Sequence, residues 1–216
     1  MPNIKAILFD MDGTLVDSIP FHKASWVSFL KKHDIVLDPE QFHAQNHGNI
    51  DEMIKRFFGT AISDEKLIEL GNEKEVMYRD LYRLHIREID GLTDFLHALK
   101  KQNIQAALAT MGDPTNIDFI LDSIKVRSFF QCITGGNEIL KGKPDPEIYE
   151  LSLEKMNLKN TDCVVIEDSK DGVLSAKKAG IKVIGITTSH TADELKQAGC
   201  FYTITDFREL DLDHIL

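Results

Sequence analysis

Residues 4–17 read IKAILFDMDGTLVD, and this segment indicates the architecture of the whole chain. Its first half is an apolar run without helical period, which predicts a short strand over 4–10, buried on both faces. Asp10 and Asp12 then close the run, and Gly13 follows directly. In open parallel sheets, sites form where the strands end. The segment therefore predicts a parallel sheet with a site at the end of its first strand.

Similar apolar runs recur along the chain, at 104–110, 131–136, 162–168, 182–188 and 202–205. Helical patterns lie between them, at 92–102, 116–124, 145–156, 172–180 and 191–199. Helix-end signals support these ranges: Asp145 as an N-cap with Pro146 at the first helical position, and Thr191 with Glu194 as a capping box. The alternation from about residue 86 onward predicts an α/β fold with a doubly wound, parallel, Rossmann-like sheet.

The segment 18–85 breaks this alternation, because it contains no strand-like run. Helical patterns occupy 21–33, 50–58 and 64–84. We therefore expect a Rossmann-like catalytic core built from 1–17 and 86–216, with an inserted α-helical cap domain over 18–85. A helical unit placed directly after a catalytic-looking loop suggests a lid over the site.

Composition and charge exclude several function classes. The chain has 216 residues, 25 Lys plus Arg against 35 Asp plus Glu, and a formal net charge of -10. It has no basic stripe, so nucleic acid and anionic membranes are poor partners. It also has no run of membrane-spanning length and no signal-peptide pattern. Three widely spaced cysteines read as free thiols. We expect a cytoplasmic monomer that binds neither nucleic acid nor membrane.

Polar side chains gather where the predicted strands end. Asp10 and Asp12 follow the first strand, Thr110 ends the second, and Glu167 with Asp168 ends the strand over 162–168. Lys143 stands before the helix predicted over 145–156. So many acids at one edge of a sheet would repel each other unless a divalent cation neutralised them. Carboxylate oxygens are hard ligands that suit Mg²⁺.

With these residues in view, the chain resembles the haloacid dehalogenase superfamily of phosphotransferases over its whole length. DMDGTLVDS at 10–18 looks like the nucleophile motif, AT at 109–110 the second motif, GKPDPEIY at 142–149 the lysine motif and IEDSKDGVLSAKKAG at 166–180 the acidic metal motif. The four motifs together, each at the expected strand end, are highly specific. The helical insert resembles the subgroup with a small α-helical cap, which includes beta-phosphoglucomutase-like enzymes and sugar-phosphate phosphatases.

The resemblance implies a role for each catalytic residue. Asp10 would be the nucleophile that forms an aspartyl-phosphate, and Asp12 the general acid and base. Thr110 would hold phosphoryl oxygens, and Lys143 would neutralise developing charge.

The resemblance also implies ligand-binding residues. Mg²⁺ would be bound by Asp10, the backbone carbonyl of Asp12 and Asp168, with Glu167 in an outer or alternate position. The backbone amides of Met111 and Gly112 would bind phosphate. On the cap, the expected substrate-binding residues are His22, Asn46, Gly48 and Lys74, with specificity set around 43–49.

The leading interpretation is a Mg²⁺-dependent phosphatase, a phosphoric monoester hydrolase acting on a small phosphorylated metabolite such as a sugar or polyol phosphate. The alternative is a beta-phosphoglucomutase-type phosphomutase, which His22 and Lys74 favour. Mutases of this branch carry an arginine where this chain has Asp51, and Lys55 or Arg56 would have to replace it. A second alternative, a phospho-receiver or binding module, fits poorly with the helical insert and the D-x-D spacing.

Overall fold

The computed structural model describes residues 4–45 and 48–212 of the chain. It divides into two compact units, one made of Met1–Asp17 with Ile86–Leu216 and the other of Ser18–His85. We call the first the core unit and the second the helical unit, and each is described by itself.

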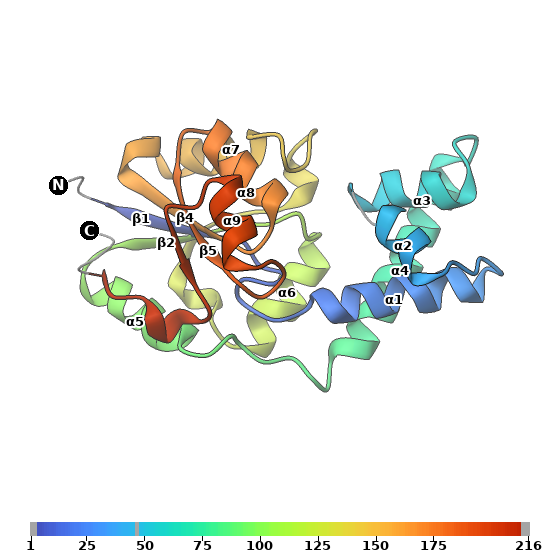
Figure 1. The fold of residues 1–216 in the computed structure, drawn as a ribbon, viewed down its shortest axis with the longest axis horizontal. Coiled ribbons are helices and arrows are strands. Elements are labelled where there is room, and N and C mark those ends of the chain that lie inside the picture. Colours follow the sequence, from blue (N-terminus) through green and yellow to red (C-terminus); the bar gives the residue numbers. More distant parts are fainter. Residues whose placement is uncertain (1–3, 46–47, 213–216) are drawn as a thin grey trace. The chain divides into compact units, whose positions relative to one another are not determined.

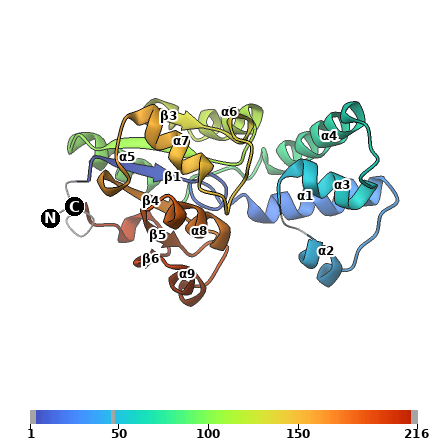
Figure 2. The ribbon, with the colours of Figure 1, turned by 90° about the horizontal axis from the view of Figure 1, so that it is seen from above.

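The core unit is built on one sheet of six parallel strands. The strands are β1 Ala6–Phe9, β2 Gln105–Ala109, β3 Phe130–Thr134, β4 Cys163–Glu167, β5 Lys182–Ile186 and β6 Tyr202–Ile204. They lie in the order β3-β2-β1-β4-β5-β6; Figure 2 labels β3, β1, β4, β5 and β6 in this order. All six predicted strands are present, and the predicted doubly wound α/β fold is confirmed. The chain moves outward through β1, β2 and β3 in one direction and then outward through β4, β5 and β6 in the other, so the topological switch point lies between β1 and β4.

Helices cover both faces of the sheet (Figure 1). Within the described residues of this unit, the α-helices are α5 Leu92–Lys101, α6 Pro114–Ser123, α7 Glu147–Met156, α8 Lys170–Lys178 and α9 Ala192–Ala198. Short 3₁₀ turns lie at Arg127–Phe129, Gly136–Glu138, Asn160–Asp162 and Phe207–Glu209. Alternate residues of β1 serve opposite faces. Leu8 packs in a cluster with Ile148 of α7 and Val173 of α8. Phe9 contacts the ring of Phe95 on α5, with centroids 6.2 Å apart. The apolar run of β1 is therefore buried on both sides, as the sequence predicts.

The predicted cap of the helix over 145–156 is wrong by a residue. We expected Asp145 to cap the helix and Pro146 to be its first residue, whereas α7 begins at Glu147 and Pro146 is the N-cap. The reason is that the Pro146 carbonyl already accepts from the amides of Tyr149 and Glu150, both at 3.0 Å. The carboxylate of Asp145 still accepts from the Glu147 amide at 3.2 Å. The predicted capping box of Thr191 and Glu194 at the start of α9 is confirmed.

The helical unit contains α1 Ile19–Lys32, α2 Pro39–Gln45, α3 Ile50–Phe58 and α4 Asp64–Tyr82. Three of these were predicted; α2 was not. Trp26 and Phe29 of α1, Ile54 of α3 and Leu70 of α4 form the centre of its own hydrophobic core.

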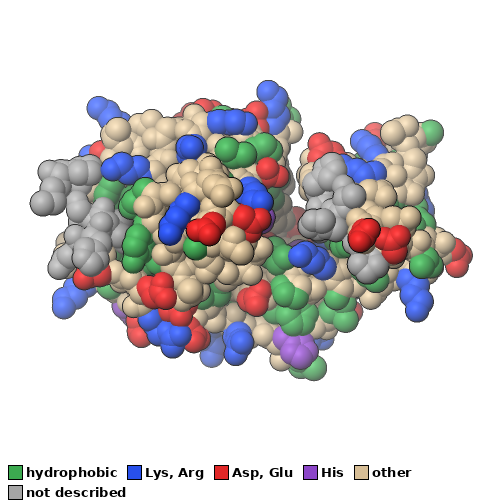
Figure 3. Space-filling view, in the orientation of Figure 1, with side chains coloured by type: hydrophobic (Ala, Val, Ile, Leu, Met, Phe, Trp, Pro, Cys, Tyr) green, Lys and Arg blue, Asp and Glu red, His purple; other side chains and the backbone are tan. Residues whose placement is uncertain are grey.

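Charges of both signs are interspersed on the face seen in Figure 3. Within the part of the chain that the structure describes, no helix is both long and apolar enough to cross a bilayer.

Candidate active site

The end of β1 carries the first acidic group of the site. Asp10 follows the strand directly, is only 7% exposed, and its amide donates to the Ile166 carbonyl of β4 at 3.1 Å. The chain then turns through Gly13, whose φ is +83°. A Cβ on Gly13 would lie 2.1 Å from Oδ2 of Asp168. Glycine is therefore required there both by the left-handed backbone and by the close approach of the Asp168 carboxylate.

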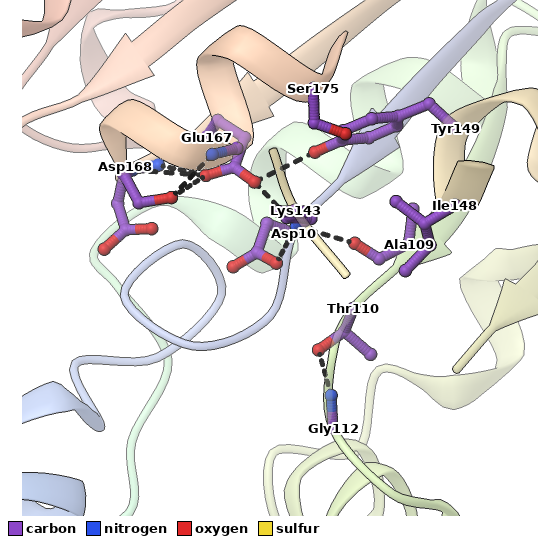
Figure 4. A network of polar contacts seen from close by, with 12 residues as sticks. Asp10, Ala109, Thr110, Gly112, Lys143, Ile148, Tyr149, Glu167, Asp168 and Ser175 are labelled. Atoms are coloured by element: carbon purple, nitrogen blue, oxygen red, sulfur yellow. Dashed lines mark hydrogen bonds and ion pairs between the residues drawn. The ribbon is translucent and has the colours of Figure 1, made fainter. Parts of the chain in front are cut away.

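Lys143 lies at the centre of the cluster (Figure 4). Its Nζ donates to Oδ1 of Asp10 at 2.6 Å, to Oε1 of Glu167 at 2.6 Å and to the Ala109 carbonyl at 3.2 Å. An ammonium group has three hydrogens, so each of them has an acceptor. The side chain of Lys143 is 7% exposed, so solvent screens these ion pairs very little. The lysine that the sequence places in a loop is thereby held against the expected nucleophile.

Glu167 is fully buried and accepts from five donors. On Oε1 these are Lys143 and the Tyr149 hydroxyl, the latter at 2.9 Å. On Oε2 they are the Asp168 amide at 3.0 Å, the Ser169 amide at 3.2 Å and the Ser169 hydroxyl at 3.1 Å. A Cβ on Gly172 of α8 would lie 1.8 Å from Oε1 of this carboxylate. Glycine at that position leaves room for the carboxylate against the first turn of the helix.

Burial and like charges shift the pKa values of this cluster. Burial, together with the negative charges of Glu167 and Asp12, raises the pKa of Asp10 to about 8, although Lys143 opposes the shift. Burial, then Glu167 and Asp10, raise the pKa of Asp168 well above its ordinary value. Burial alone would lower the pKa of Lys143, but attraction to Asp10 and Glu167 outweighs it and raises that pKa. One lysine thus does not balance the carboxylates, and the cluster is short of positive charge.

The acidic cluster suits a divalent cation. Carboxylate oxygens of Asp10, Glu167 and Asp168 all lie within 4.8 Å of one another, and all three residues are buried. Hard oxygen ligands and a deficit of positive charge are what a cation such as Mg²⁺ requires. Asp12 is half-buried in the turn that follows Asp10, and its charge contributes to the raised pKa of Asp10. The residues present therefore fit a metal ion of this kind.

The expected phosphate-binding residues follow β2. Thr110 is buried, and its amide donates to the Thr134 carbonyl at 3.0 Å. Its hydroxyl accepts from the Gly112 amide at 3.0 Å (Figure 4). We expected both following amides to face a phosphoryl group, but the Gly112 amide is directed at Thr110. The Met111 amide is left as the candidate of the two.

Two groups of polar contacts were not predicted from the sequence. The first is Tyr149, which ends the GKPDPEIY motif and reads from its spacing as a core residue of the helix. The second follows β5, where Thr188 donates to the Gly13 carbonyl, Ser189 donates to Oδ2 of Asp168, and Nδ1 of His190 lies 3.1 Å from the Asp168 carbonyl oxygen. The rule that sites form at strand ends would have indicated this second group.

In the helical unit, two of the expected substrate-binding residues lie together. The ring of His22 stacks on Tyr78 with centroids 3.7 Å apart, and Nδ1 of His22 is 3.1 Å from Nζ of Lys74. Lys74 is 2% exposed and also pairs with Glu75 at 2.8 Å. Gly48 precedes α3 and has a φ of +88°. The fourth expected residue, Asn46, lies outside the described residues.

The chain matches the family model described as haloacid dehalogenase-like hydrolase over residues 7–186. Validoxylamine A 7'-phosphate phosphatase of Streptomyces hygroscopicus subsp. limoneus is 25% identical, over 98% of this chain and 98% of its own. Beta-phosphoglucomutase of Bacillus subtilis (strain 168) is 27% identical, over 85% and 83%. The crystal structure of a HAD hydrolase, family IA, variant 3, from Entamoeba histolytica HM-1:IMSS superposes with a TM-score of 0.89 at 32% identity, over 98% and 97%.

The family match and the phosphatase relative confirm the expected enzyme class, a phosphoric monoester hydrolase. Because the family model spans well over half of the chain and the sheet carries the expected motifs at its strand ends, the protein belongs to the haloacid dehalogenase-like hydrolases.

Proposed function

We propose that this protein is a Mg²⁺-dependent phosphatase that hydrolyses a small phosphorylated metabolite, such as a sugar or polyol phosphate, through an aspartyl-phosphate on Asp10. The observation that carries the proposal is the buried cluster in which Lys143 bridges Asp10 and Glu167, with Asp168 beside them. A carboxylate that attacks a phosphate dianion needs positive charge nearby, because two negative groups must approach each other. Lys143 supplies such a charge beside Asp10, in a site that is shielded from water.

The first chemical step transfers the phosphoryl group to the enzyme. A carboxylate oxygen of Asp10 attacks phosphorus, the bond between phosphorus and the ester oxygen breaks, and the leaving alkoxide takes a proton from Asp12. Lys143, already 2.6 Å from Asp10, offsets negative charge as the phosphoryl group approaches. Thr110 and the Met111 amide would hold its remaining oxygens.

The second step releases phosphate. Asp12, now ionised, takes a proton from a water molecule that attacks phosphorus, and the bond between phosphorus and the Asp10 oxygen breaks. Inorganic phosphate leaves and both aspartates return to their starting forms.

A Mg²⁺ ion held by Asp10, Asp168 and the Asp12 carbonyl would supply the positive charge that the cluster lacks. Its presence would also favour the ionised form of Asp10, whose pKa is otherwise about 8. Glu167 would act from outside this set, since its oxygens already accept five hydrogen bonds.

Substrate recognition is assigned to the helical unit, in the role of a cap. The contact between His22 and Lys74 supports this, because a buried lysine beside a histidine is an unusual choice for a helical core. Asn46 and Gly48 complete the proposed set. We also propose a cytoplasmic monomer; the three free cysteines support the cytoplasmic location.

A phosphate-release assay tests the main proposal. The protein is incubated with Mg²⁺ and a panel of sugar phosphates, polyol phosphates, nucleotides and pyrophosphate, and free phosphate is measured. We expect release from at least one small monoester, and loss of that release in Asp10→Asn with the circular dichroism spectrum unchanged. Substantial turnover by the Asn variant would exclude Asp10 as the nucleophile.

The mutase alternative rests on the pair of His22 and Lys74 and is opposed by Asp51. Asp51 lies in the first turn of α3 and is exposed, and a carboxylate there would repel a second substrate phosphate. Incubated with a hexose phosphate and primed with a bisphosphate, the enzyme should release phosphate and should not interconvert the 1- and 6-phosphates. Rapid interconversion with little phosphate release would reverse this preference and assign the clamp to Lys55, Arg56 or Lys74.

A further inference from the structure

We infer that Tyr149 is a positioning residue of the active site, whose hydroxyl acts through Glu167 to hold Lys143 against Asp10. The inference rests on the proposed phosphatase reaction for its catalytic meaning. The contacts themselves do not depend on a substrate, because they join the buried side chains of Tyr149, Glu167 and Lys143.

The geometry begins with one oxygen atom. Oε1 of Glu167 accepts from Nζ of Lys143 at 2.6 Å and from the hydroxyl of Tyr149 at 2.9 Å (Figure 4). Both donors come from one short segment, GKPDPEIY, whose lysine precedes α7 and whose tyrosine lies in the first turn of that helix. The two ends of the motif therefore converge on a single acceptor, and the helix fixes the position of one of them.

Oε2 of Glu167 cannot take over the hydrogen bond to Lys143 if the contact between Tyr149 and Oε1 is lost. Oε2 already accepts from the Asp168 amide and from the amide and hydroxyl of Ser169. A carboxylate has about four lone-pair sites, so five donors saturate it and define its rotation. Removing the Tyr149 hydroxyl leaves Lys143 as the sole side-chain donor on Oε1. The position of Oε1 is then set only by Lys143 and by the donors on Oε2, so the Glu167–Lys143 pair is held less rigidly beside Asp10.

Burial makes this single hydroxyl matter. Tyr149 and Glu167 are both fully buried, so water does not compete for their hydrogen bond. The ring of Tyr149 also lies 5.2 Å from Nζ of Lys143, which is a cation–π contact. A phenylalanine would keep the ring, the packing and this contact. Tyr149→Phe therefore isolates the hydroxyl.

The test compares Tyr149→Phe with a matched control on the same helix. Ser152→Ala removes another buried hydroxyl of α7, which donates to the Ile148 carbonyl at 2.7 Å, lies 2.9 Å from the Thr134 hydroxyl and makes no hydrogen bond to the cluster. Mn²⁺ binding is measured by electron paramagnetic resonance, and kcat and KM are measured with the best substrate of the phosphate-release panel. We expect Tyr149→Phe to weaken Mn²⁺ binding about tenfold and to lower kcat about tenfold, with KM unchanged. Ser152→Ala should leave all three values within about twofold, even where it lowers the denaturation midpoint equally.

A double variant then identifies the route. If the hydroxyl acts through Glu167, Tyr149→Phe should change Mn²⁺ affinity by less than about twofold once Glu167→Gln is present. Equal effects of Tyr149→Phe in both backgrounds would overturn the inference, and so would unchanged Mn²⁺ affinity and kcat in the single variant. Absence of phosphate release by the wild-type protein would refute the proposed function alone, because the Mn²⁺ comparison would still be decided.

Discussion

Removing the charge of Asp10 should stabilise the metal-free protein while abolishing its activity. Asp10 is 7% exposed, and burial with the neighbouring carboxylates raises its pKa from 3.8 to about 8. In Asp10→Asn the shape is nearly preserved and the ionisable group is gone. Lys143 is not left unpaired by the change, because Oε1 of Glu167 remains 2.6 Å from its Nζ.

The sign follows from proton linkage. Between pH 3.8 and about 8 the folded protein holds a proton on Asp10 that the unfolded chain has released, so stability falls as pH rises through this window. One pKa unit corresponds to about 1.4 kcal/mol. A shift of about four units sets an upper limit of about 6 kcal/mol at pH 8 and above. This limit already includes the attraction of Lys143, and relaxation and water entry in the folded protein reduce such a burial penalty, so we expect a net gain of about 3 kcal/mol for the Asn variant.

Urea unfolding in the presence of a chelator measures this gain. The wild-type protein and Asp10→Asn should differ little near pH 4, and the difference in unfolding free energy should widen steadily toward pH 8. Asp80→Asn is the control, because Asp80 is an exposed carboxylate paired with Arg83 at 2.6 Å. That variant should stay within about 0.5 kcal/mol of the wild type at each pH. Parallel pH profiles for wild type and Asp10→Asn, or a less stable Asn variant at pH 8, would refute the reasoning. Attraction to Lys143 would then outweigh the cost of burying the carboxylate.

The remaining predictions concern the metal and the space around Glu167. Chelation should stop phosphate release, and added Mg²⁺ should restore it. Excess Ca²⁺ should inhibit the enzyme, because its looser coordination misplaces the nucleophile. Full activity after exhaustive chelation would contradict a metal requirement. Asp168→Ala should weaken Mg²⁺ binding, measured by calorimetry. Gly172→Ala should cost about 1–3 kcal/mol in urea unfolding and most of the activity, because its Cβ would lie 1.8 Å from Glu167. Gly71→Ala in α4, whose nearest neighbour would be 3.6 Å away, should instead stabilise by about 0.5–1 kcal/mol.

The sheet was predictable because its strands are buried on both faces. Such strands read as continuous apolar runs, and β1 and β4 have no exposed residue to interrupt the run. The helix α2, Pro39–Gln45, was not predicted for the opposite reason. It is seven residues long, and Phe42 is its one strongly apolar residue, so no periodic pattern could emerge.

The acids of the candidate site were predictable because they stand next to strand ends, where position in sequence fixes position in space. Their partners were not. Tyr149 carries an aromatic ring at a core position, and only the folded chain shows that its hydroxyl meets Glu167 at 2.9 Å. Ser189 is exposed and reads as an ordinary loop residue, yet it donates to Asp168, 21 residues earlier in the chain. Contacts of this kind depend on the packing of β4 beside β5, and spacing along the sequence does not encode them.

The carboxylates of this cluster lower the stability of the fold at this edge of the sheet. Three carboxylates around one lysine cost folding free energy, and an apolar or amide side chain at Asp10 would be cheaper for the fold. The protein offsets part of this cost with neutral donors, namely the Tyr149 hydroxyl and the amides and hydroxyl that follow β4. Neutral donors hold the carboxylates in place without neutralising them. A net negative charge therefore remains in the cluster, which suits the proposed cation, and hydrogen bonds already fix Lys143 against Asp10.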